Sequence, residues 1–333
     1  MGARPVRPNV WPKVIIIVVI IFLILSFGIS VYAGNFFFNL VLTKDGQESI
    51  FKNIDVSEYD KDKGNFSIED FKKEVTDANN WAQQNQTETW QIVSEDKLKL
   101  SGRVFIQKQI NTKWVIAVHG YANDSEDMYL QAKNFYLRGY NVLLPDCRAH
   151  GDSEGKYIGM GWLDRRDIVQ WVHKIIEMQP DAEIVLYGIS MGAAAVMMAS
   201  GEDDLPVHVK CIIEDCGYSS VWEQLSSELK TLLNMPPFPV LYSADIISKL
   251  KAGYSFHQAS SIEQVRRAKV PIMFIHGEAD EFVPGNMVYQ VYEAAPVEKE
   301  LLVVPDTGHT RCCACDKEYW NKILAFTQKY VNL

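Results

Sequence analysis

The stretch LYGISMGAAAV, from Leu186 to Val196, constrains the fold more than any other part of the sequence. The apolar run EIVLY, which leads into this stretch, reads as a buried strand, and the segment MGAAAVMMAS reads as a helix. Only Gly188, Ile189 and Ser190 remain to turn the chain between these two elements. Glycines two residues before and two residues after Ser190 remove β-carbons that would collide in so sharp a turn. The pattern predicts that Ser190 lies at the tip of a strand-turn-helix unit as a nucleophile; the alternative is a structural serine in a glycine-flanked turn.

Apolar runs alternate with amphipathic segments from Thr87 to the end of the chain. ETWQIVSEDKLKLSGRVFIQ predicts two antiparallel strands around a turn. Further strands are predicted at KWVIAVHG, YNVLLPD, EIVLYG, KCIIEDCG, VPIMFIHG and ELLVVPD, and helices at Ser125–Tyr136, Asp164–Met178, Met191–Ser200 and Lys317–Val331. Strands that are apolar on both faces and alternate with helices predict a mostly parallel sheet covered on both sides. In such a sheet the functional site is expected at the carboxyl ends of the strands.

A segment without any charged residue runs from Val14 to Thr43. Its core, residues 14–34, is long and apolar enough to cross a bilayer as a helix. Positive charges precede it, at Arg4, Arg7 and Lys13, and none follows immediately. This bias predicts that residues 1–13 lie in the cytoplasm and that the chain after the membrane-spanning segment lies outside the cell. The alternative is a cleavable signal peptide, since small residues precede Gly34. Either interpretation exports the domain.

The charge of the chain limits its partners. The formal net charge is −9, and because the first thirteen residues are basic, the remainder is more acidic still. An acidic body argues against nucleic acid as a partner. Residues 35–86 are polar and in parts prone to form helix, which predicts a stalk with one helix packed under the main domain. The sequence says nothing about an oligomer.

Four predicted strands end in residues that can take part in chemistry. They lead into His119-Gly120-Tyr121, Gly188-Ile189-Ser190, Asp280 and His309. A serine hydroxyl is a weak nucleophile at neutral pH and needs a base within hydrogen-bonding reach. His309, on the loop after the last predicted strand, is the candidate base.

Several stretches of the sequence resemble those of a known family. VHGYANDSEDM, LLPDCRAHGDSEG, GISMG, IHGEADEFVP and the histidine of TGHT match α/β-hydrolase-fold serine hydrolases in order and spacing, from Thr87 to the end of the chain. The N-terminal apolar segment matches a group of membrane-anchored bacterial esterase-like and lipase-like hydrolases. The resemblance implies an α/β-hydrolase core over residues 87–216 and 270–333. It also implies that residues 217–269 form a small helical lid inserted into that core.

The resemblance assigns roles to individual residues. Ser190 becomes the nucleophile, His309 the base, and Asp280 the acid that orients the imidazole and stabilises its protonated form. The backbone N–H groups of Tyr121 and Met191 become the oxyanion hole that stabilises the tetrahedral intermediate. His119 and His276 are assigned to supporting hydrogen bonds. The charged residues of DCRAHGDSEG are interpreted as a polar scaffold that braces the loop beside the nucleophile.

Three aromatic residues are candidates for the substrate pocket: Tyr121, Trp222 and Phe238. For Tyr121 the alternative is packing at a strand end. For Trp222, Phe238 and the other apolar residues of the predicted lid, the alternative is contact with the sheet domain. The short lid favours small or medium acyl groups.

The function expected from these residues is hydrolysis of carboxylic esters through an acyl-enzyme on Ser190. The same groups could cleave an amide, a thioester or a small peptide, and a non-catalytic surface protein that binds a ligand in the cleft is the alternative outside the enzymes. No metal or organic cofactor is required by this chemistry. Cys312, Cys313 and Cys315 follow His309 closely. Their spacing matches no standard metal-ligand pattern, which argues against a metal site and leaves a disulfide open.

Overall fold

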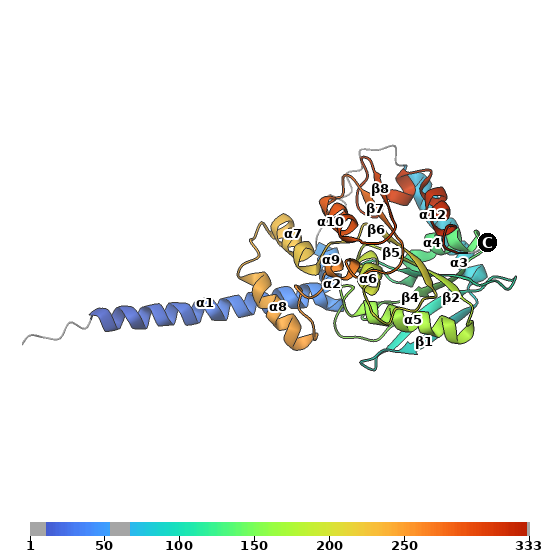
Figure 1. The fold of residues 1–333 in the computed structure, drawn as a ribbon. Coiled ribbons are helices and arrows are strands. Elements are labelled where there is room, and N and C mark those ends of the chain that lie inside the picture. The colour runs from blue at the N-terminus through green and yellow to red at the C-terminus, as the bar shows by residue number, and fades with distance from the viewer. Residues whose placement is uncertain (1–10, 54–66, 332–333) are drawn as a thin grey trace, which may run out of the picture.

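A computed structural model describes residues 11–53 and 67–331 (Figure 1). Its centre is an eight-stranded sheet in the order β1-β2-β4-β3-β5-β6-β7-β8. The strands are β1 (Glu88–Val93), β2 (Lys99–Phe105), β3 (Lys113–Val118), β4 (Asn141–Pro145), β5 (Glu183–Ile189), β6 (Val209–Asp215), β7 (Ile272–Gly277) and β8 (Lys299–Val304). Each strand predicted from the sequence is present. The apolar runs of β3 to β7 are almost wholly buried, whereas β1, at the edge of the sheet, buries Trp90 alone.

The first two strands differ in direction from the rest. β2 pairs antiparallel with both β1 and β4, while every pair from β4 to β8 is parallel. β3 and β5 align from Lys113 opposite Glu183 to Val118 opposite Gly188, so their carboxyl ends coincide. The predicted mostly parallel sheet is therefore confirmed, and its parallel strands deliver their following loops to one edge.

Helices cover both faces of the sheet (Figure 1). One face packs against α3 (Ile68–Asn85), α4 (Tyr129–Tyr136) and α12 (Tyr319–Thr327). The other packs against α5 (Asp164–Met178), α6 (Met191–Ala199) and α10 (Asn286–Ala294). The predicted helix at Ser125–Tyr136 is divided between a short 3-10 turn, η2 (Ser125–Met128), and α4. Two further helices, α10 and the short α11 (Cys312–Cys315), were not predicted from the sequence.

The N-terminal helix α1 (Trp11–Leu42) is longer than the segment 14–34 suggested by composition. Within the described residues it is the one helix long and apolar enough to cross a membrane, and no residue of its most apolar part is buried. Its last turns instead enter the domain, where Phe37, Phe38 and Leu42 are buried. The carbonyl of Leu42 accepts a hydrogen bond from the N–H of Ile158 at 3.0 Å. α1 is therefore continuous with the hydrophobic core.

Two helices follow within the predicted stalk, α2 (Lys44–Asn53) and α3, and residues 54–66 of that stalk lie outside the described residues, as do residues 1–10 of the predicted cytoplasmic tail. α3 begins at Ser67, whose side chain accepts a hydrogen bond from the N–H of Asp70. Trp81 of α3 stacks on Phe105 of β2 with ring centroids 4.9 Å apart. α3 is thus packed on the sheet domain.

The insertion, residues 217–269, contains three helices: α7 (Val221–Leu233), α8 (Val240–Lys251) and α9 (Ser261–Val265). α7 begins at Ser220, whose hydroxyl accepts a hydrogen bond from the N–H of Glu223. Figure 1 shows α7 and α8 projecting from the sheet domain, with α8 lying alongside the domain-proximal part of α1.

Candidate active site

Ser190 lies in the turn between β5 and α6, as the glycine spacing predicts. Its backbone has φ 55° and ψ −117°, a conformation that L-residues rarely adopt. A β-carbon on Gly188 would lie 2.3 Å from the carbonyl oxygen of Gly192, and one on Gly192 would lie 2.2 Å from that of Val118. Both glycines are needed because the strand and the helix approach so closely here. Strain of this kind at a polar residue is typical of functional sites.

The first turn of α6 lies beside Ser190. Ser190 is the residue that precedes the first turn of the helix, and Met191 opens it. The first N–H groups of a helix have no partner within the helix and carry the positive end of its dipole. The N–H of Met191 therefore belongs to a region suited to an anion.

The loop after β3 lies on the other side of Ser190. A β-carbon on Gly120 would lie 3.4 Å from the β-carbon of Ser190. His119 holds this loop: its Nδ1 donates to the carbonyl of Gly120 at 2.8 Å and its Nε2 accepts from the N–H of Cys147 at 2.9 Å, the assignment that satisfies both bonds. His119 is buried and thus has the supporting role expected for it. Its neighbour Tyr121 lies within reach of the same space.

His309 and Asp280 complete a hydrogen-bonded chain with Ser190. The Ser190 hydroxyl donates to Nε2 of His309 at 2.9 Å, and Nδ1 of His309 donates to Oδ2 of Asp280 at 2.7 Å. The other carboxylate oxygen, Oδ1, accepts from the N–H groups of Phe282 at 3.0 Å and Val283 at 2.8 Å. The structure thus brings together three residues that the sequence separates by up to 119 positions.

A second histidine lies against the same carboxylate. Nε2 of His276 is 3.3 Å from Oδ2 of Asp280 and 3.0 Å from the carbonyl oxygen of Val283. Both His276 and Asp280 are buried. His276 therefore restrains the position of Asp280, in line with the supporting role expected from the sequence.

The electrostatics of this chain favour charge separation between His309 and Asp280. Burial by itself disfavours the charged carboxylate, but His309 and then His276 hold the pKa of Asp280 well below its usual value. Burial likewise lowers the pKa of His309, but the Asp280 carboxylate outweighs it and raises the pKa of this imidazole above its usual value. An imidazole in this setting can take a proton from Ser190 and be stabilised once it is charged.

Buried thiols lie directly behind His309. The sulfur of Cys216 is 3.8 Å from that of Cys312 and 3.0 Å from Oδ1 of Asp215. All six cysteines are free thiols in the structure. Two groups in the described part of the chain bring three metal-binding atoms together: Asp215, Cys216 and Cys312, and Cys216, Asp280 and His309. A metal in the second group would take the atoms that now hydrogen-bond to one another.

A cavity of about 590 Å³ opens at Ser190. Its walls come from α3 (Phe71, Val75, Asn79), the loop after β3 (Gly120, Tyr121, Asn123), η2 and α4 (Glu126, Asp127, Met128, Leu130, Gln131), and the site itself (Ile189, Ser190, Phe282, His309, Thr310). Residues 35–86 were interpreted as a stalk with one helix packed under the main domain, and the contribution of α3 to the cavity wall was missed. The spacing of Phe71, Val75, Ala78 and Ala82 along one helix face was the available signal.

The three aromatic residues predicted for the pocket do not lie together in the structure. Tyr121 lines the cavity, and its hydroxyl donates to the carbonyl of Val41 in α1 at 3.0 Å. Trp222 and Phe238 are not among the residues that line this cavity. Trp222 stacks on His257 at 3.8 Å between ring centroids, and the Phe238 side chain is 69% exposed. Both lie in a cluster of the insertion with Tyr242.

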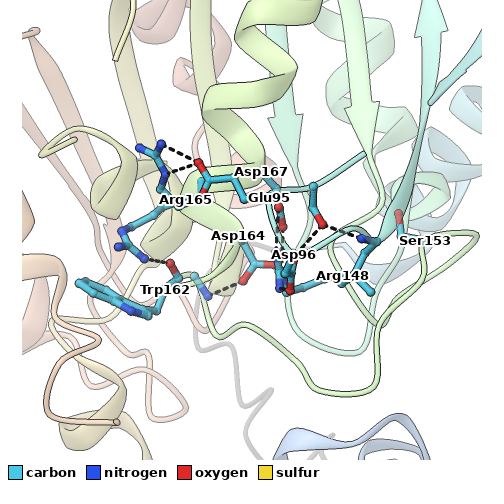
Figure 2. Close-up of polar contacts among 12 residues, drawn as sticks. Glu95, Asp96, Arg148, Ser153, Trp162, Asp164, Arg165 and Asp167 are labelled. Atoms are coloured by element: carbon cyan, nitrogen blue, oxygen red, sulfur yellow. Dashed lines mark hydrogen bonds and ion pairs between the residues drawn. The ribbon is translucent and has the colours of Figure 1, made fainter. Parts of the chain in front are cut away.

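The charged loop after β4 is a scaffold. Oδ1 of Asp146 accepts from the N–H of Ser125 at 2.8 Å and Oδ2 accepts from the N–H of Asp152 at 3.0 Å. Figure 2 shows Arg148 among carboxylates: it donates to both oxygens of Asp167, at 2.9 and 2.8 Å, and to Asp96 at 2.9 Å. None of these atoms bonds to Ser190, Asp280 or His309, as far as the described residues extend. The cluster joins the loop to α5 and to the turn between β1 and β2.

The sheet order, the turn at Ser190 and the loops at the carboxyl ends of its strands define an α/β-hydrolase fold. A family model described as "Serine aminopeptidase, S33" (Hydrolase_4) matches residues 109–235. The esterase Pf2001 of Pyrococcus furiosus is similar in structure, with a TM-score of 0.60 and 26% identity over 74% of this chain and 94% of the esterase.

Two curated bacterial relatives are similar in sequence. The uncharacterized protein YqkD of Bacillus subtilis is 26% identical over 62% of this chain and 68% of its own length. The uncharacterized protein YfhR of Escherichia coli K12 is 24% identical over 59% of this chain and 62% of its own length. The chain thus spans somewhat less than two thirds of YfhR.

Proposed function

We propose that this protein is a serine esterase that hydrolyses carboxylic esters through an acyl-enzyme on Ser190. The observation that carries the proposal is the continuous hydrogen-bonded chain from Ser190 through His309 to Asp280 at the floor of an open cavity. A strained serine at a helix start, with a base that is itself oriented by a buried carboxylate, suits nucleophilic attack on a carbonyl.

In the proposed reaction, Ser190 Oγ forms a bond to the ester carbonyl carbon while its proton passes to Nε2 of His309. The carbonyl oxygen becomes an oxyanion beside the N–H groups of Met191 and Tyr121. The carbon–oxygen bond of the ester then breaks, and His309 returns the proton to the departing alkoxide. Water attacks the acyl-enzyme with His309 again as the base, which releases the acid and restores Ser190.

We infer that α1 is a retained membrane anchor, with its N-terminus in the cytoplasm and the catalytic domain outside. The support is that no residue in the most apolar part of α1 is buried, together with the basic residues that precede it. Residues 217–269 are proposed as the lid. The substrate is proposed to be an ester of small or medium acyl length, and no cofactor enters the reaction.

The test is hydrolysis of p-nitrophenyl esters from acetate to palmitate by the detergent-solubilised full chain and by Ser190→Ala. We expect turnover of the shorter esters and a fall in kcat of at least about 10³-fold in the variant, since removal of a nucleophile leaves only binding and oxyanion stabilisation. Ester turnover that survives in Ser190→Ala would contradict the proposal.

Amides, thioesters and small peptides use the same chemistry, and the family description that matches residues 109–235 names a serine aminopeptidase. Labelling of Ser190 by a fluorophosphonate without ester turnover would move the assignment to one of these acyl groups. Absence of both labelling and turnover would favour a non-catalytic protein that binds a ligand in the cleft.

A further inference from the structure

The outer side of α8 and the turn just before it carry a row of large apolar side chains. Phe238, Tyr242, Ile246 and Leu250 are 69%, 49%, 62% and 80% exposed. A spacing of four residues places Tyr242, Ile246 and Leu250 along one side of the helix. Phe238, in the turn before α8, lies against Tyr242 with ring centroids 5.8 Å apart. The opposite side, which includes Leu241, faces the protein and is buried. A helix whose outer side faced water would carry polar residues in these positions.

This helix is packed directly on α1. A β-carbon on Gly34 would lie 2.4 Å from the β-carbon of Ser243, so the two helices approach as closely as only small residues allow. The hydroxyls of Ser30 and Ser243 are hydrogen-bonded at 2.7 Å. The position of α8 along α1 is therefore fixed by contacts of the helices themselves.

The contact lies at the depth of a membrane surface. A hydrocarbon core of about 30 Å takes up about 20 helical residues at a rise of 1.5 Å each. Counted from Val14, the first residue of the charge-free segment, this length ends near Ala33. Ser30 and Gly34 then lie at the outer edge of the hydrocarbon, and Figure 1 shows the α7–α8 unit extending along α1 from the sheet domain.

The charges of α8 fit the same environment. Lys249 and Lys251 lie in its last turn, and Lys251 donates to the side-chain oxygen of Asn35 at 2.7 Å. Asp245, the one acidic residue between Phe238 and Lys251, is turned inward and accepts a hydrogen bond from the N–H of Phe256. Lysines beside an apolar helix face are suited to the phosphate groups of a bilayer.

We propose that α8 lies in the outer surface of the bilayer, with the side chains of Phe238, Tyr242, Ile246 and Leu250 among the lipid acyl chains. This inference rests on the membrane anchorage of α1 proposed above. Its partner is phospholipid, because the apolar row is continuous with a lipid-facing helix. One consequence follows for the substrate: Val41, which accepts the hydrogen bond from Tyr121 at the cavity, lies about 10 Å along α1 beyond Gly34. The cavity thus opens close to the membrane surface, within reach of amphiphilic esters.

The test places the photoreactive residue p-benzoylphenylalanine at Ile246 in the full chain, reconstituted into phosphatidylcholine–phosphatidylglycerol nanodiscs. The same residue at Phe22 in α1 is the positive control. At Ile110, which is fully exposed but belongs to a loop of the sheet domain, it is the matched negative control. After irradiation, mass spectrometry measures the fraction of each protein that carries the mass of a phospholipid.

We expect lipid adducts at Phe22 and Ile246, with at least about tenfold more at Ile246 than at Ile110. Adducts at Phe22 together with only the Ile110 level at Ile246, or a link from Ile246 to a second copy of the chain, would overturn the inference and leave the esterase proposal intact. Absence of adducts at Phe22 would overturn the anchorage, and the inference with it.

A second variant measures the functional consequence. Ile246→Glu with Leu250→Glu places two carboxylates on the apolar row, and both positions are exposed, so the fold should tolerate them. Turnover of a medium-chain ester held in the bilayer should fall about tenfold, with hydrolysis of dissolved p-nitrophenyl butyrate unchanged within about twofold. Equal loss on both substrates would contradict a role at the membrane, and loss of neither would contradict insertion of α8.

Discussion

Arg148 follows β4 and Ser190 follows β5, the two strands that flank β3, and each lies in a cluster of charged or polar side chains. Arg148 uses each of its three guanidinium nitrogens to hydrogen-bond to Asp167 or Asp96, and the cluster joins three parts of the backbone. Ser190 instead has a strained backbone, and its hydroxyl and His309 border an open cavity. Buried charge alone therefore does not identify a site; strain and access to a cavity separate the reactive cluster from the one that holds the fold.

The largest expected difference between the two clusters is in catalysis. Asp280→Asn keeps an acceptor for the N–H groups of Phe282 and Val283 but removes the charge next to His309. We expect kcat on p-nitrophenyl butyrate to fall about 10⁴-fold, because the imidazole loses both its orientation and the stabilisation of its protonated form. Asp167→Asn at the Arg148 cluster is the matched control and should retain activity while the protein is folded. Near-normal turnover by Asp280→Asn would contradict the assigned role.

The opposite difference is expected in stability. Arg148→Met leaves the carboxylates of Asp167 and Asp96 without their buried cation, which should cost about 3–5 kcal/mol of unfolding free energy. Arg266→Met, which breaks an exposed pair with Glu263, should cost less than about 1 kcal/mol. Denaturant unfolding of the detergent-solubilised full chain measures both. Similar losses in the two variants would show that burial does not distinguish these pairs.

The pH dependence of kcat/KM tests the charge state within the reactive cluster. The neutral imidazole of His309 acts as the base, and Asp280 raises its pKa above the ordinary value of about 6.5. Activity should therefore be lost as the pH falls through a midpoint above 6.5. The measurement is kcat/KM on p-nitrophenyl butyrate from pH 5 upward, with unfolding followed at each pH. A midpoint at or below 6.5 in folded protein would contradict an ionised Asp280 beside His309.

The smallest effect is expected at Tyr121, where a structural bond lies next to the reactive cluster. Tyr121→Phe removes the hydrogen bond to Val41 and should cost about 1 kcal/mol of stability. Tyr218→Phe, which loses a comparable bond to Met160, is the matched control. Turnover of dissolved esters by Tyr121→Phe should change less than about threefold, because the backbone N–H and not the hydroxyl is the proposed oxyanion donor. A fall of 100-fold or more would place the hydroxyl in the chemistry.

The sequence predicted the strands and the turn at Ser190 because these depend on local properties. The burial of each strand shows in its own composition, and the close approach of β5 and α6 shows in the two glycines. Ser190, Asp280 and His309 were chosen as candidates from the order of the motifs. The structure places the side chain of His309 within hydrogen-bonding distance of both others.

The features that the sequence did not predict depend on contacts between residues that are distant in the chain. Composition ended the apolar helix at residue 34, whereas the helix continues to Leu42 because Ile158 and α8 pack on its last turns. Trp222 and Phe238 were candidate pocket residues because they are aromatic and lie in the insertion, but the orientation of that insertion is set by its contacts with α1. No pattern within residues 217–269 records those contacts.

The most direct test of the central claim is covalent labelling of Ser190 in the full chain by a fluorophosphonate, followed by mass spectrometry of the intact protein and its peptides. We predict one adduct, on the peptide that contains Ser190, with none in Ser190→Ala and much slower formation in His309→Ala. A wild-type protein that hydrolyses esters without labelling at Ser190, or that labels equally fast without His309, would contradict the account.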